Sequence, residues 1–239
     1  MLNDYRKSAH IYDMHLRQHL DYSAACGKIR EFIDRHNPRA KTLLDVACGT
    51  GQHLEQLQDH FNVEGLDISP RMLDVARSRC PDIMFHQGSL THFDLHKQFD
   101  VITCLYASLA LVKTLDNVKL AIASMARHLT DSGILLIESW WSPEQLWVGK
   151  LMADSTDEPD LKVASMYIIK REGRLSVFDI HYMVGTPQGI EYFVEREELG
   201  LFTREEYTEA LESVGLQVSF YDTDLFPNHR YGVYIAKKH

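Results

Sequence analysis

The sequence lacks the features that mark several common protein classes. Its 239 residues contain no run near the ~18 apolar residues that a membrane-spanning helix needs. The first ten residues are polar and show no apolar leader, so we expect no export. Only 25 Lys and Arg stand against 34 Asp and Glu, a formal net charge of -9. Proteins that neutralise DNA or RNA phosphates carry the opposite bias, so we expect neither a nucleic acid nor a membrane as partner.

Disulfide and metal patterns are also missing. The four cysteines are widely spaced and form no CxxC pair: Cys26, Cys48, Cys80 and Cys104. Thirteen histidines include no HxH or HExxH spacing, so we predict no metal site. The cysteines are interpreted as reduced thiols that pack as small apolar groups, which favours a cytoplasmic protein.

The sequence does contain an alternation of strand and helix patterns. Hydrophobic residues make up 45% and charged residues 25%, an ordinary balance for a globular α/β domain. Residues 4–36 read mostly as helix. Short apolar strands are then predicted at 42–47, 62–67, 83–86, 99–106 and 133–140, with helices at 52–60, 70–79 and 118–129. Such alternation predicts right-handed crossovers and a doubly wound, mostly parallel, Rossmann-like sheet.

The pattern changes after residue 141. Three β-rich stretches, 162–169, 174–184 and 189–197, are joined by short turns and predict an antiparallel meander. We expect an insertion at 142–197 within a Rossmann-like domain formed by 1–141 and 198–239. Thr203 and Glu206 predict a capping box for a helix over 203–214. Strands at 216–221 and 231–237 then bring the main sheet to seven, as an antiparallel hairpin at its edge.

A glycine-rich loop follows the first strand, in the run Asp45-Val46-Ala47-Cys48-Gly49-Thr50-Gly51. Glycines remove Cβ atoms there, so the chain can turn sharply and a ligand can lie against the backbone. Asp67 ends the second strand, 18 residues beyond Gly49. A carboxylate in that position can accept hydrogen bonds from both hydroxyls of a ribose.

Two phosphate-binding signatures are absent around this loop. A dinucleotide fold needs a third glycine where this chain has Leu54, and no Gly-Lys-Ser/Thr tripeptide occurs. A ligand with ribose and adenine but no phosphate fits better, and S-adenosylmethionine (SAM) is such a ligand.

Four motifs carry a resemblance to a known family. LLDVACGTGQHLE, GLDISPRMLDVAR, HQGSL and FDVITCLYASL have the order and spacing of the cofactor motifs of class I SAM-dependent methyltransferases. The segments DYSAA (21–25), ESWWSPE (138–144) and GLFT (200–203) further resemble the aminodeoxysugar N,N-dimethyltransferases. Those enzymes build the dimethylamino sugars of macrolide antibiotics from nucleotide-linked 3-amino sugars.

The resemblance implies which residues hold SAM. Asp67 would bind the ribose, Ile68 and Met72 the adenine, and Tyr22 the methionyl end. The full implied set is Tyr22, Asp45, Ala47, Gly49, Gly51, His53, Asp67, Ile68, Met72, Gly88, Ser89, Leu90, Leu105 and Tyr106. Two departures stand out: Ser89 replaces a frequent Asp, and Ala-Ser-Leu-Ala-Leu at 107–111 replaces a Ser-Ser-(Ile/Val)-Gly segment.

Methyl transfer from a sulfonium is an in-line displacement with an activated leaving group. Positioning therefore supplies most of the acceleration, and no strict catalytic signature is expected.

Tyr12, Tyr106 and Glu138 are the catalytic candidates. Tyr12 is either a packing residue or a residue near the acceptor amine, which the resemblance favours. Glu138 meets either substrate or a structural Arg or Lys. The candidates for substrate contact are Tyr12, Trp140, Trp141, His181 and His229, each with a plain packing, solvated-face or turn alternative.

Three functions are compatible with these features. Methylation of a small polar amine, such as an amino sugar in natural-product metabolism, is the first. The same site could instead transfer the aminocarboxypropyl group of SAM or cyclise the cofactor, and a catalytically silent SAM-binding module is the third. We also expect a homodimer, because an apolar face of the insertion (Ile168, Val177, Ile180 and Tyr182) must be covered by a second copy or by the main sheet.

Overall fold

The computed structural model describes residues 7–17, 20–226 and 231–238. Its helices are α1 (Ala9–Arg17), α2 (Tyr22–His36), α3 (Gln52–Leu57), α4 (Pro70–Arg79), α5 (Leu115–Arg127), α6 (Arg204–Glu212) and the short 3-10 helix η1 (Ser108–Val112). None of these helices is long and apolar enough to cross a membrane.

Seven strands form the main sheet, in the order β11-β12-β5-β4-β1-β2-β3. Their bounds are β1 (Thr42–Val46), β2 (Asn62–Asp67), β3 (Met84–Gln87), β4 (Phe99–Cys104), β5 (Leu129–Glu138), β11 (Leu216–Tyr221) and β12 (Val233–Lys238). The first five are parallel, while β12 runs antiparallel to both β5 and β11. The predicted fold and the predicted edge hairpin are therefore confirmed.

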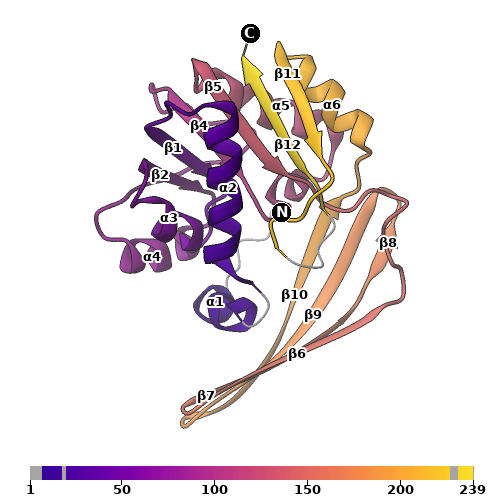
Figure 1. Ribbon diagram of the computed structural model, residues 1–239. Coiled ribbons are helices and arrows are strands. Elements are labelled where there is room, and N and C mark those ends of the chain that lie inside the picture. The colour runs from indigo at the N-terminus through magenta and orange to yellow at the C-terminus, as the bar shows by residue number, and fades with distance from the viewer. Residues whose placement is uncertain (1–6, 18–19, 227–230, 239) are drawn as a thin grey trace.

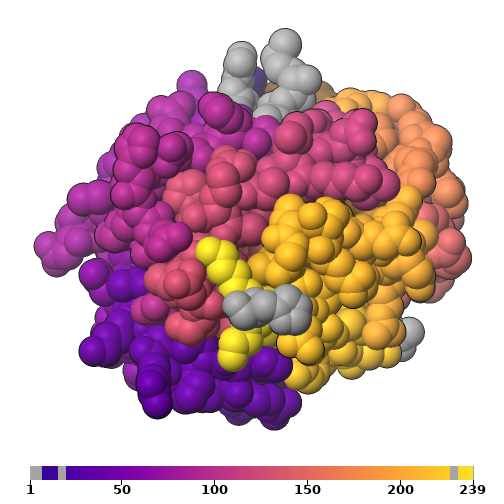
Figure 2. All heavy atoms as spheres, turned by 90° about the horizontal axis from the view of Figure 1, so that it is seen from above, coloured from indigo at the N-terminus to yellow at the C-terminus, as the bar shows by residue number. Residues whose placement is uncertain are grey.

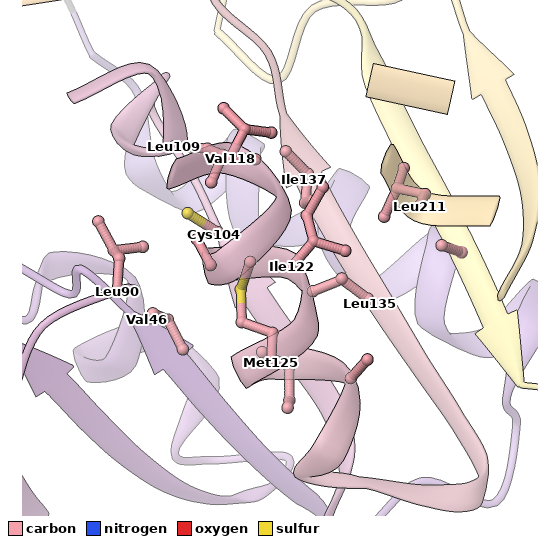
Figure 3. Close-up of a cluster of buried hydrophobic side chains, with 14 of the residues drawn as sticks. Val46, Leu90, Cys104, Leu109, Val118, Ile122, Met125, Leu135, Ile137 and Leu211 are labelled. Carbon is pink, nitrogen blue, oxygen red and sulfur yellow. The ribbon is translucent and has the colours of Figure 1, made fainter. Parts of the chain in front are cut away.

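Helices cover both faces of this sheet (Figure 1). On one face Val118, Ile122 and Met125 of α5 pack onto Leu135 and Ile137 of β5, all fully buried (Figure 3). On the other face, Ile29 and Ile33 of α2 pack against Leu43 of β1, Val101 of β4 and Ile235 of β12. Burial on both faces explains why these strands are mostly apolar instead of alternating between apolar and polar residues.

The N-terminal region departs from the single helical stretch expected over 4–36. Asp21 caps α2 by accepting the backbone N–H of Ala24 (2.9 Å), so α2 starts a new helix and α1 is a separate element. Viewed from above, the indigo N-terminal and yellow C-terminal segments meet on one continuous surface (Figure 2). At the opposite edge of the sheet, Lys28 of α2 donates to the carbonyl of Asp224, which follows β11 (2.6 Å).

A second, antiparallel sheet projects from the main body as a long blade (Figure 1). Its strands are β6 (Leu151–Glu158), β7 (Leu161–Ile168), β8 (Lys170–Glu172), β9 (Leu175–Thr186) and β10 (Gly189–Gly200), in the order β10-β9-β7-β6 with β8 beside β9. The meander predicted from sequence is confirmed, and β6 and β8 are additional to it. The sequence of β6 is mainly polar and buries only Thr156, so it gives no apolar strand signal.

The expected apolar face of this blade has to be corrected. Ile180 and Tyr182 are buried within the same chain, against Ile11 of α1 and Ala107 and Ala110 at η1. Val177 is also buried, but outside that cluster. Ile168 lies on the opposite face and is 46% exposed. Alternating residues of a strand point to opposite faces, and β7 buries Val163 and Ser165 while it exposes Ile168.

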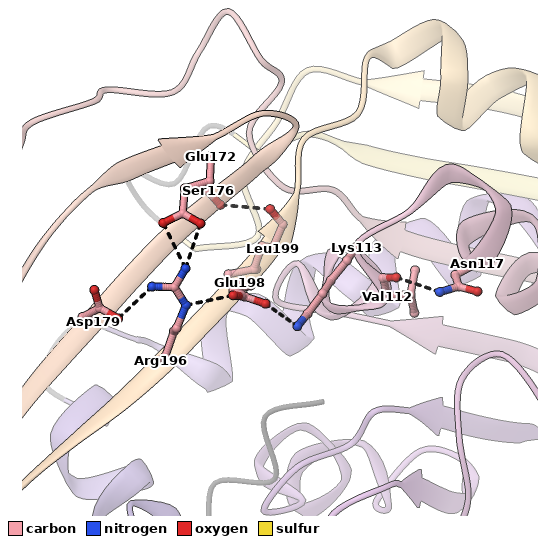
Figure 4. A network of polar contacts seen from close by, with 9 residues as sticks. All are labelled: Val112, Lys113, Asn117, Glu172, Ser176, Asp179, Arg196, Glu198 and Leu199. Carbon is pink, nitrogen blue, oxygen red and sulfur yellow. Dashed lines mark hydrogen bonds and ion pairs between the residues drawn. The ribbon is translucent and has the colours of Figure 1, made fainter. Parts of the chain in front are cut away.

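Charged side chains brace the blade against the main body (Figure 4). Arg196 of β10 pairs with Glu172 of β8, Asp179 of β9 and Glu198 of its own strand. Glu198 also accepts from Lys113, which follows η1 (2.5 Å). The network therefore connects β8, β9 and β10 of the blade to Lys113, at the end of η1 in the main body.

Candidate active site

A cavity of about 280 Å³ opens at the carboxyl ends of β1, β2 and β4. Ligands bind at this edge in open α/β sheets, because the connections there diverge to opposite faces. Nine of the predicted site residues line it: Tyr12, Ala47, Gly49, Asp67, Ile68, Met72, Gly88, Ser89 and Leu90. The structure thus brings together residues from α1, both crossover loops and the segment after β3.

Asp67 is the acidic group of this cavity. Its Oδ2 accepts the backbone N–H of Gly49 (2.9 Å) and its Oδ1 accepts that of Ser69 (2.8 Å), so the carboxylate is fixed in orientation. Burial raises the pKa of Asp67, and the two backbone donors oppose that shift. Each carboxylate oxygen can accept more than one hydrogen bond. The remaining acceptor capacity suits a pair of neighbouring hydroxyls, which is the donor set of a ribose.

The surroundings of Asp67 suit the rest of an adenosine. Ile68, Met72 and Leu90 supply apolar surface for a flat base. Gly49 lines the cavity with φ +55°, and a Cβ built on it would meet nothing within 4 Å. The backbone of the loop can therefore lie directly against a ligand. The residues present fit SAM.

Backbone strain is concentrated around the cavity. Positive φ angles occur at Ala47 (61°) after β1, and at Tyr106 (51°), Ala107 (58°) and Lys113 (69°) after β4. Residues with side chains adopt this conformation at a cost of about 1–2 kcal/mol each. Such strain persists where the surrounding structure enforces it, and it clusters at functional sites.

A second group of predicted residues packs beside the glycine loop. The rings of Tyr22 and His53 meet edge to face with centroids 5.0 Å apart, and Tyr22 and Tyr106 both contact Phe226. Burial lowers the pKa of His53 to about 4, so its ring is neutral at pH 7. Its Nε2 atom has no hydrogen-bond partner within the described part of the chain. Leu105 is buried in the same core cluster, and Gly51 is the N-cap of α3, the helix that carries His53.

Glu138 ends β5 and is fully buried. Its Oε2 accepts the backbone N–H of Tyr106 (2.7 Å), while Oε1 has no partner among the residues described. Burial raises the pKa of Glu138 to about 7. The hydrogen bond found is thus to the strained segment after β4 and not to an Arg or Lys. Asp45 is similarly buried; desolvation raises its pKa to about 7 although Thr103 donates to it (2.7 Å).

The remaining candidates lie outside the cavity lining. Trp140 donates from Nε1 to Ser176 of β9 (2.8 Å) and packs against Trp141, with ring centroids 4.4 Å apart. Both rings therefore lie under the blade. His181 is exposed and bonds to Tyr192 (2.6 Å) on the blade's outer face, so the structure does not bring it to the cavity. His229 lies outside the described residues.

Sequence reasoning missed one side of the cavity. Ser108, Leu111, Val112, Lys113 and Asn117 line it, from η1 and the start of α5. A signal was present, because this segment directly follows the carboxyl end of β4, where ligands bind. The segment 107–111 was noted only because it departs from the family pattern, and its residues were not predicted to line the site.

Known proteins resemble this chain over nearly its whole length. A methyltransferase-domain family matches residues 43–133. The chain is 37% identical over 214 residues to the dTDP-4-amino-2,3,4,6-tetradeoxy-D-glucose N,N-dimethyltransferase of Saccharopolyspora spinosa, covering 89% of this chain and 86% of that one. The crystal structure of DesVI from Streptomyces venezuelae matches with a TM-score of 0.90 and 33% identity, over 97% of this chain and 98% of that one. SAM-bound CalS10, an amino pentose methyltransferase from Micromonospora echinaspora, matches at 0.86 and 33%, over 96% and 97%.

Proposed function

This chain belongs to the class I SAM-dependent methyltransferases, in the family of the dTDP-amino-sugar N,N-dimethyltransferases, and we propose that it methylates the amino group of a nucleotide-linked amino sugar in natural-product metabolism. The observation that carries the proposal is the cavity at the ends of β1, β2 and β4. It combines an oriented acid, Asp67, with Tyr12 from a separate helix in one lining.

The proposed cofactor roles combine the cavity lining with the residues packed beside the glycine loop. Bound SAM supplies a methyl group that is already activated on a sulfonium. Asp67 would accept from the ribose, and Ile68, Met72 and Leu90 would enclose the adenine beside Gly88 and Ser89. Ala47, Gly49 and Gly51 would hold the methionine part, with Tyr22, His53, Leu105 and Tyr106 around its end. Asp45, in β1 just before the loop, accepts from Thr103 of β4 and so ties the loop's base to the neighbouring strand.

The proposed acceptor side carries one fully buried acid, Glu138, and one partly buried acid, Glu197. A free amine is protonated in neutral water and must lose one proton to expose its lone pair. Burial raises the pKa values of Glu138 and Glu197 of β10 to about 7, and both acids interact electrostatically with Tyr106. A carboxyl group in that range binds an ammonium and can take its proton at working pH. In this proposal Tyr12 and Tyr106 orient the amine, while Trp140 and Trp141 shape the wall behind it.

We assign the dimer contact to the outer face of the blade. Met166, Ile168, Met183, Tyr192 and Val194 are all more than 40% exposed there. Exposed apolar side chains gathered on one face of a sheet are typical of an interface, and a second copy is the simplest partner. The enzyme is proposed to work in the cytoplasm, which suits its four free, buried cysteines.

Product analysis tests the reaction. Purified protein is incubated with SAM and a panel of dTDP-amino sugars and small amines, and both cofactor products are followed by mass spectrometry. S-Adenosylhomocysteine together with a methylated amine is the expected result. Methylthioadenosine would indicate aminocarboxypropyl transfer instead, and SAM binding without any product would indicate a silent module. The matched control is the same sugar with a hydroxyl in place of the amine.

A further inference from the structure

A partly buried polar network joins α1 to the glycine loop. Asp13 accepts from the Thr50 hydroxyl at Oδ1 (2.6 Å) and from Arg79 Nη2 at Oδ2 (2.5 Å). Arg79, the last residue of α4, also donates to the Thr50 carbonyl (3.0 Å). The Asp13 and Arg79 side chains are only 12% and 15% exposed. We call these three residues the Asp13–Thr50–Arg79 network.

The network connects two parts of the cavity lining through neighbours in sequence. Thr50 stands between Gly49 and Gly51 in the loop, and Asp13 directly follows Tyr12. Gly49 and Tyr12 both line the cavity. A change in the loop therefore reaches Tyr12 through one hydrogen bond, and a change in α1 reaches the loop by the same route.

Helix α1 depends on such contacts for its position. It has nine residues, which is too short to be stable alone in water. Its described apolar anchors are Ala9 and Ile11. On the blade side, His15 bonds to Ser165 of β7 (2.7 Å), and the backbone N–H of Ser8 donates to Glu195 of β10 (3.2 Å). The Asp13–Thr50–Arg79 network is its attachment to the cofactor side.

We infer that Asp13, Thr50 and Arg79 are positioning residues that couple the SAM-binding loop to the placement of Tyr12. Asp13 carries a charge in a largely desolvated position, so removing its partner leaves that charge uncompensated and displaces α1. Because coupling between sites is reciprocal, bound SAM holds α1 in place and a docked α1 strengthens SAM binding. The inference rests on the cofactor site alone and not on the identity of the acceptor.

Two variants test this coupling separately. Arg79→Met removes the charged partner, and Thr50→Val removes only the hydroxyl and preserves the shape of the loop residue. For each we expect the Kd for SAM, measured by calorimetry, to rise about tenfold, as interaction energies in shared networks allow. We also expect the backbone amides of residues 9–17 to exchange hydrogen faster than in the parent protein. Added SAM should protect these amides less than it does in the parent. With any accepted amine, the KM for SAM should rise by more than kcat falls.

The control is Arg77→Met on the same helix, where Arg77 pairs with Asp74 on the exposed surface (3.5 Å). It should leave SAM affinity and α1 exchange unchanged. The double variant Asp13→Ala, Arg79→Met should lose no more SAM affinity than the weaker binder of the two single variants. The inference is overturned if Thr50→Val and Arg79→Met match Arg77→Met in both readouts. It is also overturned if the loss of SAM affinity in each variant only follows the drop in its thermal unfolding midpoint. No acceptor is needed for binding and exchange, so these results stand apart from the amino-sugar proposal.

Discussion

At the scale of single residues, the site depends on carboxyl groups removed from water. Asp45, Asp67 and Glu138 are each at least nine-tenths buried, and each has at least one hydrogen-bond donor that orients it. Their environments differ, because Asp67 receives two backbone donors whereas Glu138 keeps one oxygen without a partner in the described chain. Asp67 is therefore suited to hold a neutral polyol, and Glu138 to meet a cation.

Asp67→Asn should weaken SAM binding. The amide turns one acceptor into a donor that faces the N–H groups of Gly49 or Ser69, and it removes the charge that strengthens bonds to hydroxyls. Hydrogen bonds to charged groups contribute about 1.5–3 kcal/mol, so we expect the Kd for SAM to rise roughly ten- to a hundredfold by calorimetry. Asp74→Asn, at an exposed acid on α4, is the matched control and should bind SAM normally. Equal affinities of the two variants would contradict the assigned role.

Glu138 should make stability depend on pH. In the folded protein its pKa is about 7, against 4.5 for an ordinary glutamic acid. The folded state thus binds the proton more tightly, so this contribution to the free energy of unfolding is fully present below pH 4.5 and is lost as the pH rises through 7. Glu138→Gln, which mimics the protonated form, should lose less stability across this window in urea titrations. Glu144→Gln, on the surface, should follow the parent, and a pH dependence of Glu138→Gln as steep as that of the parent would refute the assignment.

Single residues were predictable where a chemical requirement fixed their type. Asp67 follows from the need for a ribose acceptor at the end of the second strand, and Gly49 from the need for backbone approach. For Lys113 and Asn117 the sequence gives only the general signal that their segment follows β4, because their access to the cavity depends on how η1 turns. His181 lies in a strand whose apolar and polar residues alternate. The alternation shows that His181 shares a face with its second neighbours, but only the fold shows that this face is turned outward.

At the scale of elements, α6 offers a test of local stability without effect on the cavity. Thr203 and Glu206 form a reciprocal capping box at its start, and the helix packs on α5 and β11. Thr203→Ala should lower the free energy of unfolding by about 1 kcal/mol, since it leaves backbone donors unsatisfied, and leave SAM affinity unchanged. Thr208→Ala, in the middle of the same helix, should have a smaller effect. Denaturant titration and calorimetry on the three proteins measure both quantities, and a change in Kd for Thr203→Ala would count against this separation.

The elements of the main sheet were predictable because their apolar runs and caps are local signals. Helix α4 has the bounds predicted for it, with Ser69 as its cap and Pro70 at its first position, and the Thr203 cap gave the start of α6, which ends two residues before the predicted end. The break between α1 and α2 was missed, since Asp21 also fits inside a polar helical stretch. Strand β6 was missed because its pairing with β7, and not its own composition, makes it a strand.

At the scale of the whole molecule, the outer face of the blade should control assembly. We expect two copies in solution by light scattering. Met183→Lys, at a residue 54% exposed on that face, should give a monomer that still binds SAM, because a buried lysine charge opposes the contact. Leu120→Lys, equally exposed on α5, is the control and should remain dimeric. A monomeric parent, or a dimeric Met183→Lys protein, would exclude this interface.

The position of β12 between β5 and β11 has a consequence for synthesis on the ribosome. Residues 129–138 pair with β4 on one side, but they find their second sheet neighbour only when residues 233–238 have left the exit tunnel. Until then an apolar strand edge stays open on the nascent chain, and such edges recruit other chains. Slow translation over the blade would lengthen that exposure, so expression yield should respond to chaperone supply and to codon choice across 142–200.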